Sequence, residues 1–259
     1  MTAPATQNAD RSCVWVTGAS SGIGRAVALK FSAAGWAVAA SARGGEALEK
    51  LAAEDPNRNI RPAPVDITDP DAVARVVEQI ESDIGEISLA VLNAGIYLPV
   101  RGQDFTADAF RRSFDLNLMG TVHCLDAWLS KVIARRRGHV AIVSSVAGYR
   151  GLGSAAAYGA SKAALINMAE ALKIDLADHG IKVQVVTPGF VKTPATDSNP
   201  FPMPFLVSPE EAGERIYSGL MSERFEITFP RRFTFLLKIG RCLPYSLYFR
   251  LAQRTRAGG

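Results

Sequence analysis

The amino-acid sequence predicts a single-domain α/β protein built on a doubly wound parallel sheet. Short runs rich in alanine and β-branched residues alternate with longer segments of helical period, which is typical of repeated βαβ units. A glycine-rich turn follows the first of these runs. The 259 residues, of which 48% are hydrophobic and 21% charged, can bury one sizeable core and carry too little charge for a disordered chain.

The predicted strands are short, and helical segments of about 10 to 30 residues separate them. Gly35 and Gly180 follow helical patterns as C-terminal caps, while Ser208 with Pro209 is typical of a helix start. The stretch from Asn199 to Phe205 holds three prolines and is expected to be an irregular loop. Strands are expected at Cys13–Val16, Ala37–Ala42, Ile60–Pro64, Leu89–Leu92, Val140–Ser144, Val183–Val186 and, as a seventh, Phe225–Phe229.

Cysteine usage and the N-terminus indicate a cytoplasmic protein. Cys13, Cys124 and Cys242 are odd in number and widely spaced, which argues against a disulfide framework and a cysteine-based metal site. Residues 1–11 are small and polar, lack the apolar run of a signal peptide, and are expected to be flexible. The most apolar stretch, Phe233 to Leu251, is interrupted by charges and a proline, so no membrane-spanning segment is expected.

The net charge of +4 is unevenly distributed along the chain. Seven basic residues and no acidic residue follow Glu226, so the preceding part carries 22 basic against 25 acidic residues, or −3. The positive charge is thus confined to one C-terminal segment where it alternates with aromatic and aliphatic side chains. This distribution does not favour nucleic acid as a partner.

The turn from Thr17 to Gly24 is typical of a dinucleotide-binding site. Gly18 permits the tight turn, Gly22 lets the backbone approach a pyrophosphate, and Gly24 lets the next helix press against the strand. The positive end of that helix then faces the phosphates. Three glycines alone also fit a plain strand-to-helix loop, but the strand–turn–helix context favours the binding turn.

A second pattern carries catalytic residue types. Tyr158 and Lys162 lie four residues apart on an alanine-rich helical segment, so both point from one face. Ser145 comes 13 residues before Tyr158, where an apolar strand ends. A tyrosine over a lysine stem is common on surfaces, but ligand sites of parallel sheets collect at the carboxyl ends of the strands.

With these motifs, the sequence resembles the short-chain dehydrogenase/reductase family in its ordinary single-domain, Rossmann-like form, whose members are NAD(P)-linked oxidoreductases. The resemblance covers Cys13 to Thr193. It implies that residues 12–230 form the catalytic domain. The family pattern stops there, and the basic and apolar residues of 231–259 are expected to form an amphipathic helical extension. The landmarks, in order, are Thr17 to Gly24, Asp66-Ile67, Asn93-Ala94-Gly95, Asn117, Ser145, Tyr158 with Lys162, and Pro188-Gly189 with Thr193.

The resemblance implies a chemistry in which a hydride passes between the nicotinamide and a carbonyl carbon, while Tyr158 transfers the proton at oxygen. A tyrosine has an ordinary pKa of about 10, and the positive charges of Lys162 and of the oxidised nicotinamide would lower it. Ser145 would hold the substrate oxygen, and Asn117 would kink its helix and hold a water next to Lys162. A helix asparagine that bonds locally remains the alternative for Asn117.

Cofactor choice is expected to favour NADP(H), with NAD(H) possible. An NAD enzyme would place a carboxylate after the second strand, where this chain has Ala42. Arg43 is next to it and can pair with a 2′-phosphate, although Ser21 stands where some NADP-linked relatives carry a second basic residue. Asp66 would bind the adenine amino group, Thr193 the nicotinamide amide. The full expected set is Thr17, Gly18, Ser20, Ser21, Gly22, Ile23, Gly24, Arg43, Asp66, Ile67, Asn93, Ala94, Gly95, Tyr158, Lys162, Pro188, Gly189 and Thr193.

Several alternatives stay open. The C-terminal segment has a polar stripe at Thr234, Lys238 and Arg241 and is expected either to cover the cleft as a lid or to meet a membrane surface or a partner. The substrate is expected to be a small carbonyl or alcohol. Side chains of residues 146–152 and 190–205 are expected to line its part of the cleft. A catalytically idle NADP-binding scaffold is the alternative function. Relatives dimerise through two long helices, here Asp115 to Ala134 and Tyr158 to Ala177, so a homodimer is expected.

Overall fold

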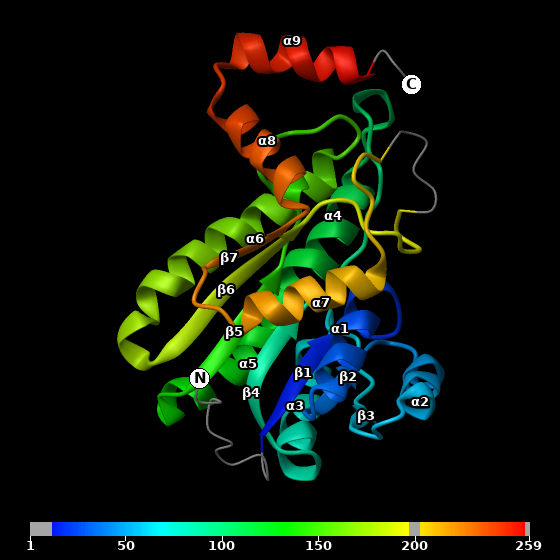
Figure 1. The fold of residues 1–259 in the computed structure, drawn as a ribbon, viewed down its shortest axis with the longest axis vertical. Coiled ribbons are helices and arrows are strands. Elements are labelled where there is room, and N and C mark those ends of the chain that lie inside the picture. Colours follow the sequence, from blue (N-terminus) through cyan, green and yellow to red (C-terminus); the bar gives the residue numbers. More distant parts are fainter. Residues whose placement is uncertain (1–11, 197–202, 257–259) are drawn as a thin grey trace.

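In the computed structural model, the described residues are 12–196 and 203–256. They form one seven-stranded parallel sheet with helices on both faces (Figure 1). The strand order is β3-β2-β1-β4-β5-β6-β7. Strands β2 and β3 are therefore added on one side of β1, and strands β4 to β7 on its other side. The switch point between β1 and β4 creates a crevice at the carboxyl ends of the strands. The N-terminus 1–11 and most of the loop expected at 199–205 lie outside the described residues.

The strands match the expected positions, with small differences at their ends. The third strand is shorter than expected and ends at Pro62, although Ala63 N still donates to Ala40 O at 2.8 Å. The sixth strand extends to Pro188 and pairs there with Phe229. The bounds are β1 Ser12–Thr17, β2 Ala37–Ser41, β3 Ile60–Pro62, β4 Glu86–Leu92, β5 Gly138–Val143, β6 Ile181–Pro188 and β7 Glu226–Phe229.

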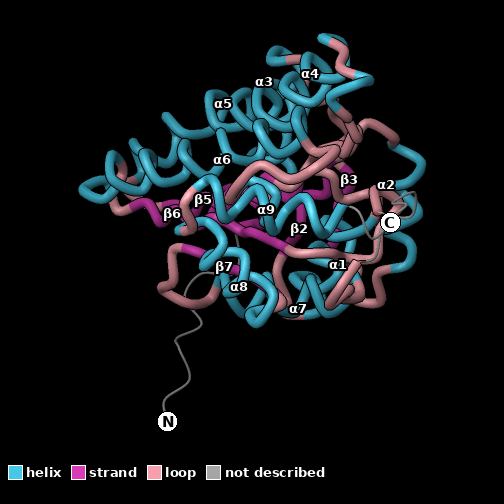
Figure 2. The backbone as a smooth tube through the Cα atoms, turned by 90° about the horizontal axis from the view of Figure 1, so that it is seen from above, coloured by secondary structure: helices cyan, strands magenta, loops and turns pink. Residues whose placement is uncertain are grey.

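Helices cover the sheet in two layers (Figure 2). Helices α1 (Gly22–Ala33), α2 (Gly45–Glu54) and α7 (Pro209–Leu220) pack on one face. Helices α3 (Pro70–Asp83), α5 (Gly120–Arg135) and α6 (Ala156–Asp175) pack on the other, with α4 (Ala107–Phe114) against α6. Helices α8 (Arg231–Cys242) and α9 (Tyr245–Arg256) follow β7, and α9 crosses over the end of the sheet.

The alternation of side chains along the strands produces two cores. In β1, Cys13 and Trp15 belong to the core under α3, α5 and α6, whereas Val14 and Val16 belong to the core under α1, α2 and α7. A strand buried on both faces reads as a continuous apolar run, which is why these strands were visible in the sequence. None of the helices in the described ranges is both long and apolar enough to cross a bilayer.

The expected helix ends are confirmed. Gly35 and Gly180 have φ angles of +84° and +71°, in the left-handed region that favours glycine. The hydroxyl of Ser208 accepts from Glu211 N at 3.1 Å and caps α7, with Pro209 in the first turn. These caps fix where α1 stops and where α7 starts.

Candidate active site

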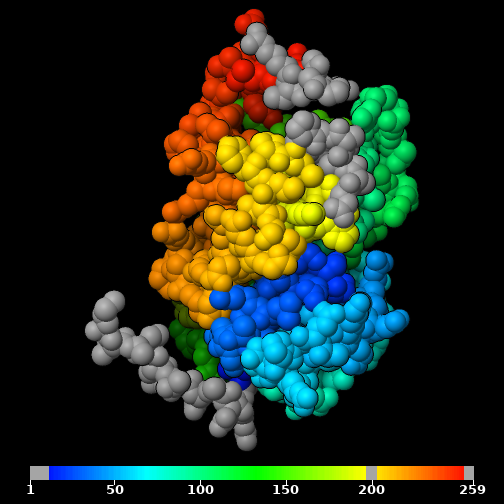
Figure 3. All heavy atoms as spheres, turned by 45° about the vertical axis from the view of Figure 1, so that its right-hand side comes forward, coloured from blue at the N-terminus to red at the C-terminus, as the bar shows by residue number. Residues whose placement is uncertain are grey.

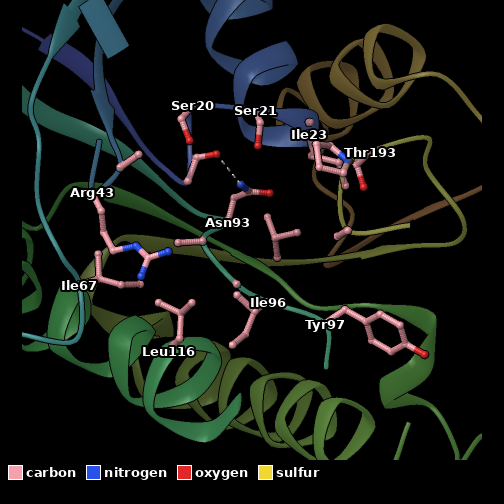
Figure 4. A pocket seen from close by; sticks show the side chains of 18 of the residues that line it. Ser20, Ser21, Ile23, Arg43, Ile67, Asn93, Ile96, Tyr97, Leu116 and Thr193 are labelled. Atoms are coloured by element: carbon pink, nitrogen blue, oxygen red, sulfur yellow. Dashed lines mark hydrogen bonds between the residues drawn. The ribbon is translucent and has the colours of Figure 1, made fainter. Parts of the chain in front are cut away.

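A cleft of about 440 Å³ opens at the crevice between β1 and β4 (Figure 4). It gathers side chains from segments that are far apart in the sequence: the turn after β1, the ends of β2 to β5, the start of α6 and the loop after β6. Its lining residues are Gly18, Ser20, Ser21, Gly22, Ile23, Ser41, Ala42, Arg43, Gly44, Val65, Asp66, Ile67, Asn93, Ala94, Gly95, Ile96, Tyr97, Leu116, Val143, Ser144, Tyr158, Lys162, Thr193, Pro194 and Ala195.

The glycine turn leaves no room for side chains. Gly18 has φ +68°, and a Cβ there would lie 2.8 Å from Ala94 Cα. A Cβ at Gly24 would lie 2.2 Å from the carbonyl oxygen of Gly18. Ser21 is the N-cap of α1 but makes no side-chain cap hydrogen bond, so the amides of the first turn are not capped by it. This arrangement is a cradle for an anion at a helix N-terminus.

Asn93 ties the end of β4 to this turn. Its Nδ2 donates to Thr17 O at 3.0 Å and approaches Gly18 O at 3.4 Å, while Asn93 N and Ala94 N donate to Thr17 Oγ1 at 2.9 and 3.1 Å. Thr17 is buried, does not line the cleft, and holds the turn from below. The asparagine and threonine are therefore part of the support of the cofactor site.

Arg43 and Asp66 stand at the far end of the cleft. Arg43 is exposed, and Figure 4 shows its side chain reaching toward Ile67. Among the described residues, Arg43 makes no hydrogen bond or ion pair. Hydrogen bonds from Thr68 N and its hydroxyl, at 3.0 and 2.8 Å, lower the pKa of Asp66, with a smaller contribution from the charge of Arg43. Asp66 is thus an ionised hydrogen-bond acceptor at this end.

Tyr158 and Lys162 project from the first two turns of α6 into the same cleft. Lys162 Nζ lies 5.7 Å from the centre of the Tyr158 ring and donates to Val143 O at 2.9 Å. Ser145 follows β5, and its Oγ accepts from Ala147 N at 3.1 Å. A hydrogen bond joins the side chains of Ser145 and Tyr158. The three expected catalytic side chains are therefore brought together.

Burial governs the titration of both groups on α6. Tyr158 is partly accessible from the cleft, and the surrounding protein still raises its pKa above 10, while the hydrogen bond from Ser145 acts in the opposite direction. Lys162 is 3% exposed, and burial lowers its pKa to about 8. The lowering of the tyrosine pKa that Lys162 and the oxidised nicotinamide are expected to produce together stays a prediction.

Asn117 lies in a π-helical turn, Asp115–Met119, between α4 and α5. Its Oδ1 accepts from Ile96 N at 2.7 Å, and its Nδ2 donates to Ile96 O and to Ser161 Oγ, both at 3.0 Å. Thr121 Oγ1 donates to its backbone oxygen at 2.9 Å. The expected distortion of the helix is thus present. The side chain does not line the cleft, because it is engaged by the chain after β4.

Pro188 and Gly189 also lie outside the cleft lining and shape the loop that follows β6. Gly189 N donates to Phe229 O at 2.7 Å, which ties this loop to β7. Thr193 lies in the lining, and Thr193 N donates to Thr196 Oγ1 at 3.0 Å. The loop therefore brings Thr193 into the cleft opposite Gly22. A Cβ added at Gly22 would lie 2.9 Å from Thr193 Cγ2.

Sequence reasoning missed several residues of the cleft lining, among them Tyr97, and it missed Ser161 beside the cleft. Tyr97 lines the cleft, with its ring edge-on to Tyr158 at 5.1 Å, and burial raises its pKa. Ser161 is buried and links Asn117 to α6, since its Oγ donates to Tyr158 O at 2.7 Å. Tyr97 follows the Asn93-Ala94-Gly95 landmark in an irregular segment and gave no signal; Ser161 was visible as a serine one turn after Tyr158.

No group of three or more His, Cys, Asp or Glu side chains that could hold a metal ion occurs within residues 12–196 and 203–256.

Comparison with known proteins agrees with this geometry. The family model described as short chain dehydrogenase matches residues 12–201. An uncharacterized oxidoreductase of Myxococcus xanthus is 36% identical over 93% of this chain and 96% of its own length. The epidermal retinol dehydrogenase 2 of Homo sapiens is 30% identical over 89% of this chain and 78% of its own. The solved structure titled ElxO with NADP bound has a TM-score of 0.76 and 26% identity, and covers 84% of this chain and 97% of that one.

The fold, the cleft and these relatives define an NAD(P)-dependent oxidoreductase. The chain belongs to the short-chain dehydrogenase/reductase family.

Proposed function

We propose that this protein interconverts a lipophilic ketone or aldehyde and the corresponding alcohol with NADP(H), through Ser145, Tyr158, Lys162 and Asn117. The observation that carries the proposal is the position of Tyr158 and Lys162 beside a glycine cradle in one cleft, with Ser145 next to Tyr158 just outside the cleft lining. The related retinol dehydrogenase is named for a lipophilic alcohol, which supports the substrate class.

The cleft fits a dinucleotide. The tight approach at Gly18 and Gly24 and the uncapped start of α1 suit a pyrophosphate, which the backbone amides would hold. Asp66 suits the adenine amino group, and Thr193 suits the nicotinamide amide. When bound, the nicotinamide supplies or accepts the hydride.

The side chains of the protein handle the proton and the substrate oxygen. Ser145 donates a hydrogen bond that orients the substrate carbonyl, and Tyr158 gives its proton to the same oxygen during reduction. Lys162 binds the nicotinamide ribose and favours the phenolate that remains, together with the positive charge of the oxidised nicotinamide. Asn117 holds its π-helical turn against Ile96. In this position it would keep the water next to Lys162 through which the proton is replaced.

NADP(H) is favoured over NAD(H) at the Arg43 end of the cleft. Ala42 lines the cleft without a carboxylate that would repel a 2′-phosphate, and the guanidinium of Arg43 has no other partner among the described residues. The NADP-bound structural relative supports the same choice. A cytoplasmic location accords with the three free cysteines.

The enzyme is proposed to work as a homodimer through α5 and α6. Leu125 and Leu165 are buried in the core of the subunit itself and are not available. The remaining members of the expected apolar rows are only partly buried and are Leu116, Val122, Leu129, Met168 and Leu172. Light scattering that gives a monomer mass at micromolar protein would contradict the dimer.

The proposed function is tested with Tyr158→Phe. We expect the variant to bind NADPH with little change but to lose turnover of a ketone and aldehyde panel by a factor on the order of 10² to 10⁴, because only the transferable proton is removed. If the wild type turns over a carbonyl compound and Tyr158→Phe does so at nearly the same rate, the role of the tyrosine is contradicted. Tight NADPH binding without turnover in the wild type would favour a cofactor-binding scaffold.

A further inference from the structure

Helix α8 turns Thr234 and Lys238 toward the protein together with Phe233 and Leu237, and it leaves a second set of apolar side chains on the outside. Thr234 is 1% exposed and Lys238 forms an ion pair with Glu226, whereas Phe235, Leu236 and Ile239 are 64%, 60% and 48% exposed. A surface helix of a globular protein normally presents charged and polar residues on its outer face. The apolar outer face of α8 indicates that it has a partner other than water.

Polar anchors fix α8 in this orientation. Glu226, on β7, accepts from Lys238, from the hydroxyl of Tyr149 and, at 2.7 Å, from Thr187 Oγ1. Burial acts to raise the pKa of Glu226, but the hydrogen bonds from Lys238, Tyr149 and Thr187 outweigh it and lower that pKa. An ionised carboxylate therefore holds the helix against the sheet, and α8 cannot rotate to bury its outer apolar side chains without breaking this partly buried ion pair.

Helix α9 is joined to the same end of the molecule through Arg150. The guanidinium donates to Gly240 O and Leu243 O at 2.7 and 2.8 Å and lies 4.0 Å from the centre of the Tyr248 ring. Tyr248 Oη donates to Gly151 O at 2.5 Å. One arginine therefore binds the end of α8 and the face of α9, and it sets the angle between them.

The two helices together carry an exposed apolar surface, here called the C-terminal patch. It forms one end of the molecule (Figures 1 and 3). Fourteen large apolar side chains are exposed in the described ranges, and seven of them lie in this patch. Clusters of this kind mark interaction sites. The patch consists of Phe235, Leu236, Ile239, Tyr245, Leu247, Phe249 and Leu251.

Charge decides which partner the patch fits. Seven basic residues and no acidic residue follow Glu226, and Arg231, Arg232, Arg241 and Arg250 are exposed on these helices. A two-fold contact with a second copy would bring these positive charges against each other. An anionic lipid surface offers an apolar layer and opposite charge at once. We propose that α8 and α9 dock the protein on the surface of an anionic lipid bilayer.

The docking surface adjoins the substrate end of the cleft. Phe233, on the inner side of α8, has its ring 5.7 Å from that of Phe190 and 5.9 Å from that of Phe205, in the segment that carries Thr193. Docking would therefore turn this end of the protein toward the bilayer, where a lipophilic carbonyl compound is concentrated. This delivery of substrate rests on the proposed function, whereas the docking itself does not.

The test is co-sedimentation of the full chain with lipid vesicles. We expect binding to vesicles containing phosphatidylserine at low salt, much weaker binding to pure phosphatidylcholine, and release at high salt. Arg232→Gln with Arg250→Gln should weaken binding about 25-fold, at about 5-fold for each arginine close to the surface. The matched control, Lys50→Gln with Arg75→Gln, removes two exposed charges elsewhere and should change little.

A second pair of variants tests the apolar contribution. Leu236→Ser with Phe249→Ser should weaken vesicle binding at least 10-fold while turnover of a short, water-soluble carbonyl stays unchanged. The control, Ile174→Ser with Met221→Ser, removes exposed apolar side chains from other surfaces and should bind normally.

Wild-type protein that stays in the supernatant with anionic vesicles at low salt overturns the docking proposal, as does a patch variant that binds vesicles normally. A patch variant that changes the oligomeric mass and leaves vesicle binding intact would assign the surface to a second copy. A wild-type protein that binds vesicles but reduces no carbonyl would contradict the proposed function and leave the docking standing.

Discussion

Replacement of Lys162 by methionine should change how the stability of the protein depends on pH. Burial lowers the pKa of Lys162 from 10.5 to about 8, so the folded protein binds fewer protons than the unfolded chain between these values. Stability therefore rises with pH across that window in the wild type. A shift of this size corresponds to about 3 kcal/mol in all, of which about 2 kcal/mol falls between pH 7.5 and pH 10.

The measurement is urea unfolding of the cofactor-free wild type and Lys162→Met at both pH values. The free energy of unfolding of the wild type, relative to the variant, should increase by about 2 kcal/mol from pH 7.5 to pH 10. Lys50→Met removes an exposed lysine and should show no such relative change. A difference between wild type and Lys162→Met that is flat with pH would mean that Lys162 is not a desolvated ammonium, and the account of its role would fail.

Three further outcomes follow from the same structure. Ala42→Asp with Arg43→Ile should move the ratio of the NADPH and NADH dissociation constants toward NADH; a wild type that already prefers NADH would refute the reading of this strand end. Burial, together with the charge of Lys182, lowers the pKa of His139 to about 4, so the protein should lose about 2 kcal/mol of stability from pH 7 to pH 4.5, and His139→Gln should lose less in urea titrations. Gly24→Ala should weaken NADPH binding at least 10-fold by calorimetry, because its Cβ meets the backbone of the turn; unchanged affinity would show that the turn has room.

The sheet and the cofactor turn could be predicted because their signals are local. Strands buried on both faces, such as β1, appear as apolar runs between helical segments. The glycines of the turn follow from a backbone that a Cβ would block, as at Gly24. The spacing of Tyr158 and Lys162 places both on one helix face whatever the surroundings.

The state of the catalytic groups and the C-terminal helices could not be predicted, because both depend on tertiary packing. The pKa values of Tyr158 and Lys162 follow from how much protein surrounds them, which spacing does not reveal. The stripe of Thr234 and Lys238 was visible in the sequence, but its inward orientation depends on Glu226, a strand residue that gave no signal of its own. Of the side chains that a lid would bury, Leu236 and Leu247 are exposed, whereas Phe233 and Leu237 pack against the core, which the sequence pattern does not distinguish.

The central claim is that this cleft transfers a hydride between NADP(H) and a carbonyl carbon while Tyr158 supplies the proton. The most direct measurement is mass spectrometry of the alcohols formed when the protein is incubated with NADPH carrying deuterium at both positions of the nicotinamide C4 and a panel of ketones and aldehydes. The account predicts one deuterium on the former carbonyl carbon of at least one product, and labelled product formed more slowly by a factor on the order of 10² to 10⁴ when Tyr158→Phe replaces the wild type. NADPH binding without deuterium in any product, or labelling at equal rates by the wild type and Tyr158→Phe, would contradict it.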